Sequence, residues 1–155
     1  MPPSPATGRP DRRREPVTQV IELEIPARAE FVGIARMAVS ALAGVRPGLP
    51  YERVDDLRIV VSEACTSAIQ AAKEGDRVIV RCFDSPEQLE VCIAAASGAF
   101  DSTLAGDGDS GADEFRISLI RALVDEAEVR PMGSGTELRL VMRRESAGVE
   151  GDLPA

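Results

Sequence analysis

The chain has 155 residues, a formal net charge of −8 and no histidine. Its length fits one domain, and the lack of histidine excludes a Ser-His-Asp triad, a Cys-His pair and a phosphohistidine relay within this chain. The three cysteines stand apart, without a Cys-x-x-Cys pair. We therefore expect no residue to be a metal ligand, and we expect the thiols to be buried and reduced.

The first 16 residues are rich in Pro and Arg, carry a net charge of +2 and predict a disordered basic tail over 1–16. The remainder carries −10, an acidic body that repels phosphate and suits a basic protein partner rather than nucleic acid. The sequence contains no run of 18 apolar residues and its N-terminus has no apolar leader. We therefore expect a cytoplasmic protein without membrane contact.

Alternating apolar and polar side chains predict a strand over 17–25, just before Pro26. Apolar residues at helical spacing predict two amphipathic helices, over 27–45 and 51–72. Alternation then returns in two short segments, and the turn between them predicts a hairpin of strands at 78–82 and 89–93.

A small, acidic, Gly-rich segment separates this hairpin from a third expected helix over 113–125. A strand near 128–129 and a last strand at 138–142 follow. Strands that arrive in pairs with helices between them favour an α+β fold: a two-layer sandwich with a mixed, mostly antiparallel sheet and about three helices on one face. The folded domain is expected over 17–144, and a disordered acidic tail over 145–155.

The second expected helix carries a line of polar residues beside its apolar stripe. At about 100° per residue, Glu63, Ser67 and Gln70 fall along one line. Glu63 is a candidate general base, and the Ser67 hydroxyl could contact a metal-bound water. An ordinary solvated helix flank gives the same pattern, because polar pairs at this spacing are common on amphipathic helices.

Two further features have both a functional and a plain interpretation. The turn at Gly133, Gly135 and Thr136 could present backbone N–H groups to a phosphate, or could simply connect two strands. Cys82 and Cys92 could face each other across the hairpin, which leaves a redox-sensing regulator open as a third hypothesis.

Three motifs in order resemble one known family. The sequence Glu-Ala-Cys-Thr-Ser-Ala at 63–68 resembles the N-box of the GHKL ATPase family, in its RsbW-type anti-sigma factor and serine-kinase branch. The segment 120–126 resembles the third-helix signature of that branch, and 133–138 resembles its closing Gly-Thr box. The resemblance covers roughly 17–143. It implies a GHKL fold, with Glu63 as the base and with ATP and Mg²⁺ as the cofactors of a functional site.

The sequence departs from the family pattern at the positions that bind nucleotide. Ser67 stands where the family has a magnesium-ligating Asn, and Ala95 stands near the place of an adenine-reading Asp. A phosphate-binding Gly pair would fall at Glu114 and Arg116. Each lost polar contact is expensive. Ser67, Gly133, Gly135 and Thr136 therefore form a vestigial ATP and magnesium site in our interpretation.

The resemblance implies a homodimeric anti-sigma factor, which holds an RNA polymerase sigma factor until an anti-anti-sigma protein of the STAS type competes for it. The alternative is an active ATP-dependent serine kinase that phosphorylates this anti-anti-sigma partner. Partner contacts are expected from the exposed side of the first helix, at Arg28 and Arg36, and from the acidic segment 101–114.

Overall fold

The computed structural model describes residues 17–97, 111–133 and 135–146. The expected tail over 1–16 and the residues 147–155 lie outside the described part of the chain, as do residues 98–110. In chain order the elements are β1 (Thr18–Pro26), a 3-10 turn (Ala29–Phe31), α1 (Val32–Ala43), α2 (Tyr51–Ala71), β2 (Arg77–Asp84), β3 (Gln88–Ala95), α3 (Gly111–Leu123), β4 (Glu126–Met132) and β5 (Gly135–Arg143).

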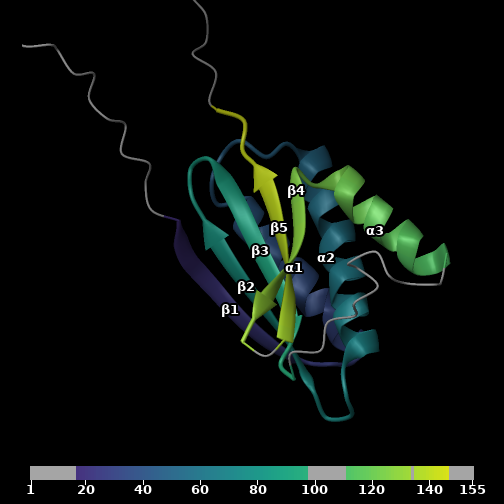
Figure 1. The fold of residues 1–155 in the computed structure, drawn as a ribbon. Helices are drawn as coiled ribbons and strands as arrows, with labels where there is room; N and C mark the ends of the chain where they lie inside the picture. Colours follow the sequence, from purple (N-terminus) through teal and green to yellow (C-terminus); the bar gives the residue numbers. More distant parts are fainter. Residues whose placement is uncertain (1–16, 98–110, 134, 147–155) are drawn as a thin grey trace, which may run out of the picture.

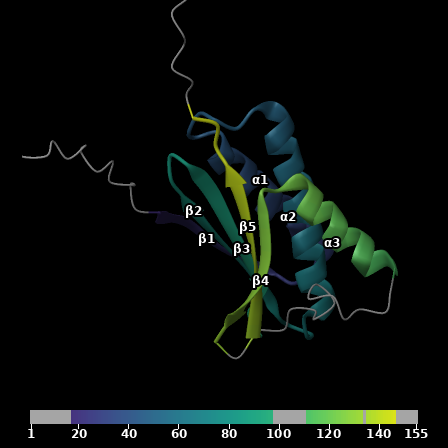
Figure 2. The ribbon, with the colours of Figure 1, turned by 45° about the horizontal axis from the view of Figure 1, so that its top comes forward.

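The strands form one five-stranded sheet in the order β1-β2-β3-β5-β4. Every neighbouring pair is antiparallel, so the sheet of the described strands is fully antiparallel and not mixed as the sequence led us to expect. Figures 1 and 2 show α1, α2 and α3 together on one side of this sheet. The predicted α+β two-layer sandwich is confirmed.

An aliphatic core lies between the two layers. Alternation in β2 directs Val78, Val80 and Cys82 toward the helices, where all three are at most 1% exposed. From the helical side, Leu57 and Ile120 are among the largest fully buried side chains. Each such side chain stabilises the fold by about 1.5–3 kcal/mol through removal of apolar surface from water.

Boundaries of all three helices differ from the sequence prediction: α1 ends at Ala43 rather than 45, α2 ends at Ala71 rather than 72, and α3 begins at Gly111 rather than 113. The first helix begins at Val32 rather than at 27, because Arg28 is extended and Ala29–Phe31 forms a 3-10 turn. The third helix ends at Leu123 rather than 125. There the N–H of Asp125 donates to the carbonyl oxygen of Val141, which starts the ladder between β4 and β5.

The sheet face turned away from the helices is covered by a network of arginines and glutamates. Glu137, only 3% exposed, accepts from Arg81 at 2.5 Å and from Arg130 at 2.7 Å. Arg139 makes an ion pair with Glu90 at 2.9 Å on the same face. These long side chains lie over the central strands and help to keep Cys92, which is 1% exposed, out of water on this face.

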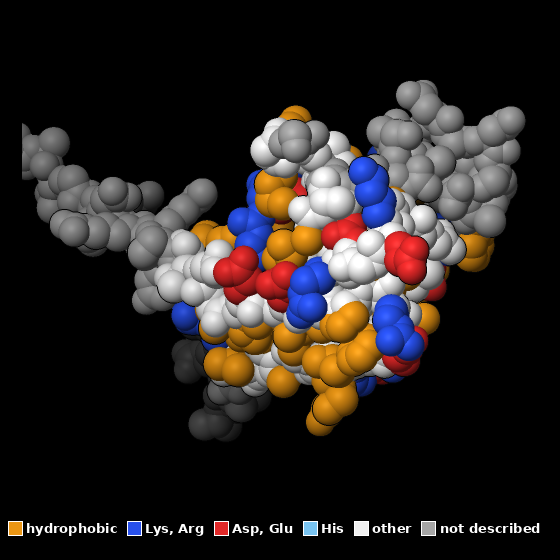
Figure 3. Space-filling model, turned by 90° about the horizontal axis from the view of Figure 1, so that it is seen from below, with side chains coloured by type: hydrophobic (Ala, Val, Ile, Leu, Met, Phe, Trp, Pro, Cys, Tyr) orange, Lys and Arg blue, Asp and Glu red, His pale blue; other side chains and the backbone are white. Residues whose placement is uncertain are grey.

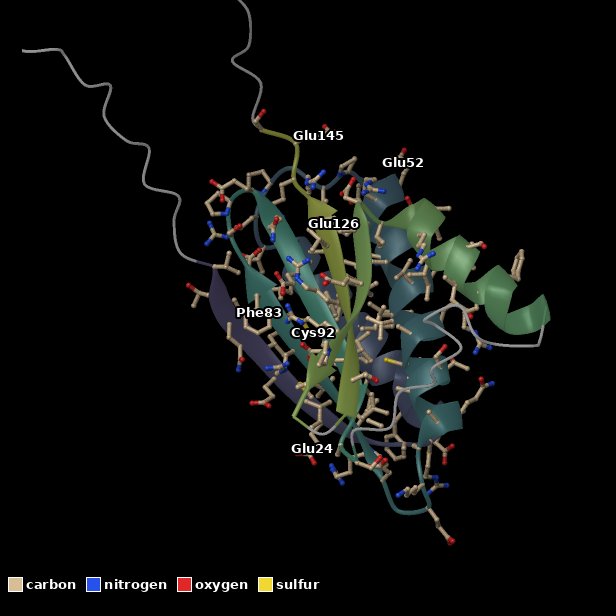
Figure 4. All side chains as sticks on the ribbon, in the orientation of Figure 1. Glu24, Glu52, Phe83, Cys92, Glu126 and Glu145 are labelled. Carbon is tan, nitrogen blue, oxygen red and sulfur yellow. The ribbon has the colours of Figure 1, made fainter. Side chains whose placement is uncertain are left out.

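The two hairpin cysteines project from opposite faces of the sheet. Cys82 lies opposite Val91 and belongs to the core, whereas Cys92 lies opposite Arg81 in the charged network. Figure 4 shows Cys92 on that outer face. Both thiols are free. Cys82 points to the same face as its cross-strand partner Val91, and Cys92, the next residue along β3, points to the opposite face. The hypothesis of a redox pair between them is therefore wrong.

Candidate functional site between helices α2 and α3

Helix α2 carries the predicted polar line along the flank that faces α3. Its apolar stripe, with Val60, Val61 and Ala64 fully buried, fixes the rotation of the helix on the sheet. Glu63 therefore lies at the edge of the core, with its side chain 35% exposed, and Ser67 is 3% exposed. The predicted alignment of Glu63, Ser67 and Gln70 on one flank is present.

One side chain from α3 joins all three residues of this line. Arg116 donates from Nε to Glu63 Oε2 at 3.1 Å, and from one terminal nitrogen to Ser67 Oγ at 3.3 Å and to Gln70 Oε1 at 2.8 Å. The side chain of Arg116 is itself only 17% exposed. The position where the family resemblance places a phosphate-binding glycine thus supplies a cation that occupies the polar flank of α2.

A second arginine joins the same two helices at their other ends. Arg53, in the first turn of α2, donates to the carbonyl oxygen of Leu123 at 2.9 Å and to Asp125 at 2.8 Å. Arg53, near the start of α2, meets the end of α3, and Gln70, near the end of α2, meets Arg116 in the first half of α3, so the two helices run antiparallel. One guanidinium therefore ties α2 to the first half of α3, and another ties it to the end of α3.

The turn predicted to bind phosphate lies between β4 and β5. Its described residues share no hydrogen bond with Glu63, Ser67 or Gln70. Gly133 adopts a φ of +59°, and Gly135 and Thr136 begin β5. Thr136 shares the helix-facing side of β5 with Leu138. Among the described residues, the hydrogen bonds of Glu63 and Ser67 to other elements go to Arg116 and not to this turn.

The end of β3 supplies no carboxylate where the family resemblance places its adenine-reading residue. Ala94 and Ala95 are 2% and 0% exposed. Just beyond this end of β3, Asp76 accepts from the Ser97 hydroxyl and from the N–H groups of Ser97 and Arg77. Burial raises the pKa of Asp76, but these hydrogen bonds outweigh it and the net pKa is lowered.

Arg116 occupies the residues that the family resemblance places at the base and at the magnesium ligand. Glu63 Oε2 and Ser67 Oγ each accept a hydrogen bond from its guanidinium. A Mg²⁺ that used the Ser67 oxygen would have to displace this positive charge. Within the described residues, no group of three His, Cys, Asp or Glu side chains could hold a metal ion.

Sequence reasoning found Glu63, Ser67 and Gln70, but it missed that Arg116 binds them. The signal was present, since Arg116 was recognised as standing in place of a glycine. Its length and charge compared with glycine could have suggested that it fills the space a ligand would take. Which acceptors it reaches depends on how α3 lies against α2, which periodicity does not give.

The comparisons with known proteins agree with this architecture. Residues 25–142 match the histidine kinase-like ATPase domain family. The chain is 39% identical over 127 residues to the serine-protein kinase RsbW of Bacillus pumilus, which covers 72% of this chain and 78% of that protein. It is 42% identical over 84 residues to the Bacillus subtilis protein of the same name, which covers 52% of each.

The fold is similar to that of the histidine kinase domain of the blue-light activated histidine kinase from Erythrobacter litoralis EL346. The TM-score is 0.50 at 22% identity, over 76% of this chain and 61% of that chain. In the described residues no helix is both long and apolar enough to cross a membrane. The chain belongs to the family of histidine kinase-like ATPase domains, among the relatives of the serine-protein kinase RsbW.

Proposed function

We propose that this protein is an anti-sigma factor that holds an RNA polymerase sigma factor without the help of a nucleotide, and that an anti-anti-sigma protein releases the sigma factor by competition. We place it in the cytoplasm as a homodimer, as the family resemblance implies. The proposal keeps the partner-binding role of the RsbW group and assigns the nucleotide site, Glu63, Ser67, Gly133, Gly135 and Thr136, a vestigial status.

The observation that carries the proposal is the apolar end of β3. Ala94 and Ala95 are buried, and the segment 94–99 contains no carboxylate. A site built to read a base by hydrogen bonds loses orders of magnitude in affinity when the reading group is missing, because the polar edge of the ligand is then buried without a partner. We therefore assign the protein a binding role.

The exposed side of α1 is the surface we assign to the partner. Arg36 and Met37 line a surface cavity of about 490 Å³ with Ser40, Ala41 and Arg58, and Met37 is 73% exposed. Arg28 pairs with Glu30 just before this helix. Figure 3 shows hydrophobic side chains gathered on the face seen from below, beside charged ones. Such a patch is typical of a protein-binding surface.

The acidic charge of the body fits the same partner. With −10 outside the first 16 residues, the protein attracts a basic sigma factor over a distance and so speeds their encounter. Close contact then rests on the apolar side chains of α1. The acidic segment 101–114, the other surface expected to contact the partner, lies for the most part outside the described residues.

One observation favours a second function, that of an active serine kinase acting on the anti-anti-sigma protein. Glu63 is retained, and its carboxylate is half-buried on α2 at the position that the resemblance assigns to the base. The matched relatives are named serine-protein kinases. This function requires Arg116 to leave Glu63 before a nucleotide could enter.

Two titrations test the proposal. The sigma factors of the source organism are titrated into the full chain, with Met37→Asp as the test variant. Val20→Asp is the control, at an apolar residue of β1 that is 51% exposed, compared with 73% for Met37. We expect one sigma factor to bind, Met37→Asp to weaken it by about tenfold or more, and the control to leave Kd unchanged. Absence of binding to every sigma factor contradicts the proposal.

In the second titration, ATP is added up to about 1 mM with and without Mg²⁺ at about 100 μM protein, in a calorimeter. We expect no heat of binding and no effect of ATP on the sigma-factor Kd. Micromolar, magnesium-dependent binding, followed by phosphate transfer that Glu63→Gln abolishes, would establish the kinase instead.

A further inference from the structure

We propose that Arg116 is a built-in clamp that holds the first half of α3 closed on α2, in the place where other members of this family hold a nucleotide. The inference rests on the proposed function, in which no nucleotide enters the site. It assigns Arg116 a positioning role, in which the side chain acts through the helix that it fixes.

The described side chains in the first half of α3 make few apolar contacts with the core. Phe115 is 69% exposed, and Ile117 lies against the core but is only partly buried. The second half of the helix is anchored better, by the 2% exposed Ile120 and by Leu123. Polar contacts must therefore supply a larger share of the attachment at the beginning of the helix than at its end.

The geometry of the clamp suits an arginine. Its three acceptors lie at positions i, i+4 and i+7 of α2, so they span about two helical turns. A planar guanidinium presents several N–H groups in a fixed fork and can reach all three at once, whereas a lysine ammonium is a single compact charge. Lysine at this position would keep the charge balance with Glu63 and lose part of the reach.

The clamp also neutralises the negative charge of Glu63. Glu63 is the carboxylate of this polar line, and the guanidinium that bonds to it supplies one compensating positive charge. A half-buried carboxylate without a partner would be costly. The ion pair removes that cost without a metal. The same guanidinium also donates hydrogen bonds to the hydroxyl of Ser67 and to the amide oxygen of Gln70.

The consequence is a fixed α3 at all nucleotide concentrations. In a protein whose helix is held by a bound ligand, the position of that helix follows the ligand concentration by mass action. Here the tie is covalently part of α3. Any surface that α3 helps to form is then present whenever the chain is folded.

Hydrogen exchange followed by mass spectrometry on the full chain tests this. We expect Arg116→Ala to accelerate exchange of the amides in 115–120 by about tenfold or more, with the amides of β2 and β3 unchanged within about twofold. Arg116→Lys should give an intermediate rate. Arg121→Ala, at an exposed position on the same helix, is the matched control and should leave the rates unchanged.

Two results would overturn the clamp: rates in Arg116→Ala that stay within about twofold of the unaltered chain, or slowing of α3 exchange in the unaltered chain by about 1 mM ATP with Mg²⁺. Equal acceleration by Arg121→Ala would also overturn it. None of these measurements involves a sigma factor, so failure to bind one would count against the proposed function alone.

Discussion

Arg144 and Asp84 form an ion pair at 2.8 Å in which the two side chains are 0% and 5% exposed. Asp84 also accepts from Arg46 at 2.6 Å, and Arg144 donates to the carbonyl oxygens of Ala43 and Arg46. These contacts join the end of β5 to β2 and to the loop between α1 and α2. A buried charge cluster thus closes the end of the molecule opposite the β4–β5 turn.

Removing one partner of this pair should be strongly destabilising. Asp84→Asn leaves the buried guanidinium of Arg144 without its counter-charge, so we expect the free energy of unfolding to fall by about 3–5 kcal/mol. Urea unfolding followed by circular dichroism measures this. The control Glu24→Gln breaks an ion pair with Arg77 whose side chains are about half exposed, and it should cost no more than about 1 kcal/mol. An equal loss of unfolding free energy in the two variants would contradict the view that burial makes the Asp84–Arg144 pair more costly to break.

Two glycines with positive φ should respond differently to alanine. A Cβ at Gly48, with φ +108°, would lie 2.7 Å from the carbonyl oxygen of Glu145 and 2.9 Å from Arg144 Cβ. At Gly75, with φ +78°, it would meet nothing within 4 Å. Gly75→Ala should therefore cost about 1–2 kcal/mol from backbone strain alone, and Gly48→Ala about 3 kcal/mol or more because contact is added. Similar unfolding free energies for the two variants would refute this difference.

The three thiols should be inert in the folded protein. Burial raises the pKa of Cys65, Cys82 and Cys92 to about 12. Since the thiolate is the reactive form, we expect fewer than about 0.1 thiol per chain to react with a disulfide reagent at pH 8. All three should react after unfolding in denaturant. Rapid reaction of one thiol in the native state would show that the site is open to solvent.

Asp76 should add stability that disappears in acid. Its folded pKa is lowered below the ordinary value of 3.8, so its contribution is present above that value and is lost as the pH falls through the folded pKa. Asp76→Asn weakens the hydrogen bonds at Ser97 and Arg77 and should cost about 1 kcal/mol at pH 7. The difference in unfolding free energy between the two proteins should begin to shrink below about pH 4 and should vanish once the pH is below the folded pKa. A gap that is constant from neutral pH to acid would contradict the assignment.

Sequence periodicity predicts the elements of this fold well where one face is buried. In β2 the alternation of Val78, Val80 and Cys82 matches the observed core directly. β4 is harder to detect: the sequence indicated only 128–129, whereas the strand runs over Glu126–Met132. It lies at the edge of the sheet, and Pro131 interrupts its pattern, so its extent follows from pairing with β5 rather than from its own residues.

Relations within one element were predictable, and relations between elements were not. Glu63, Ser67 and Gln70 are aligned because a helix aligns them, so their spacing sufficed. The opposite outcome holds for Cys82 and Cys92, where an offset of one residue in the register puts the side chains on different faces. Arg116 meets Glu63 across 53 positions of sequence, and only the docking of α3 decides that contact.

The order of the sheet leaves β1 and β4 as its edges, and both are poor templates for a further strand. β1 has an irregular register between Gln19 and Ile21, carries Glu22 and Glu24, and ends at Pro26. β4 contains Pro131, which lacks the N–H that an added strand would need. Bulges, charges and prolines at edges prevent edge-to-edge aggregation. Copies of this chain should therefore associate through a face of the molecule, and a crowded solution should not extend the sheet into fibrils.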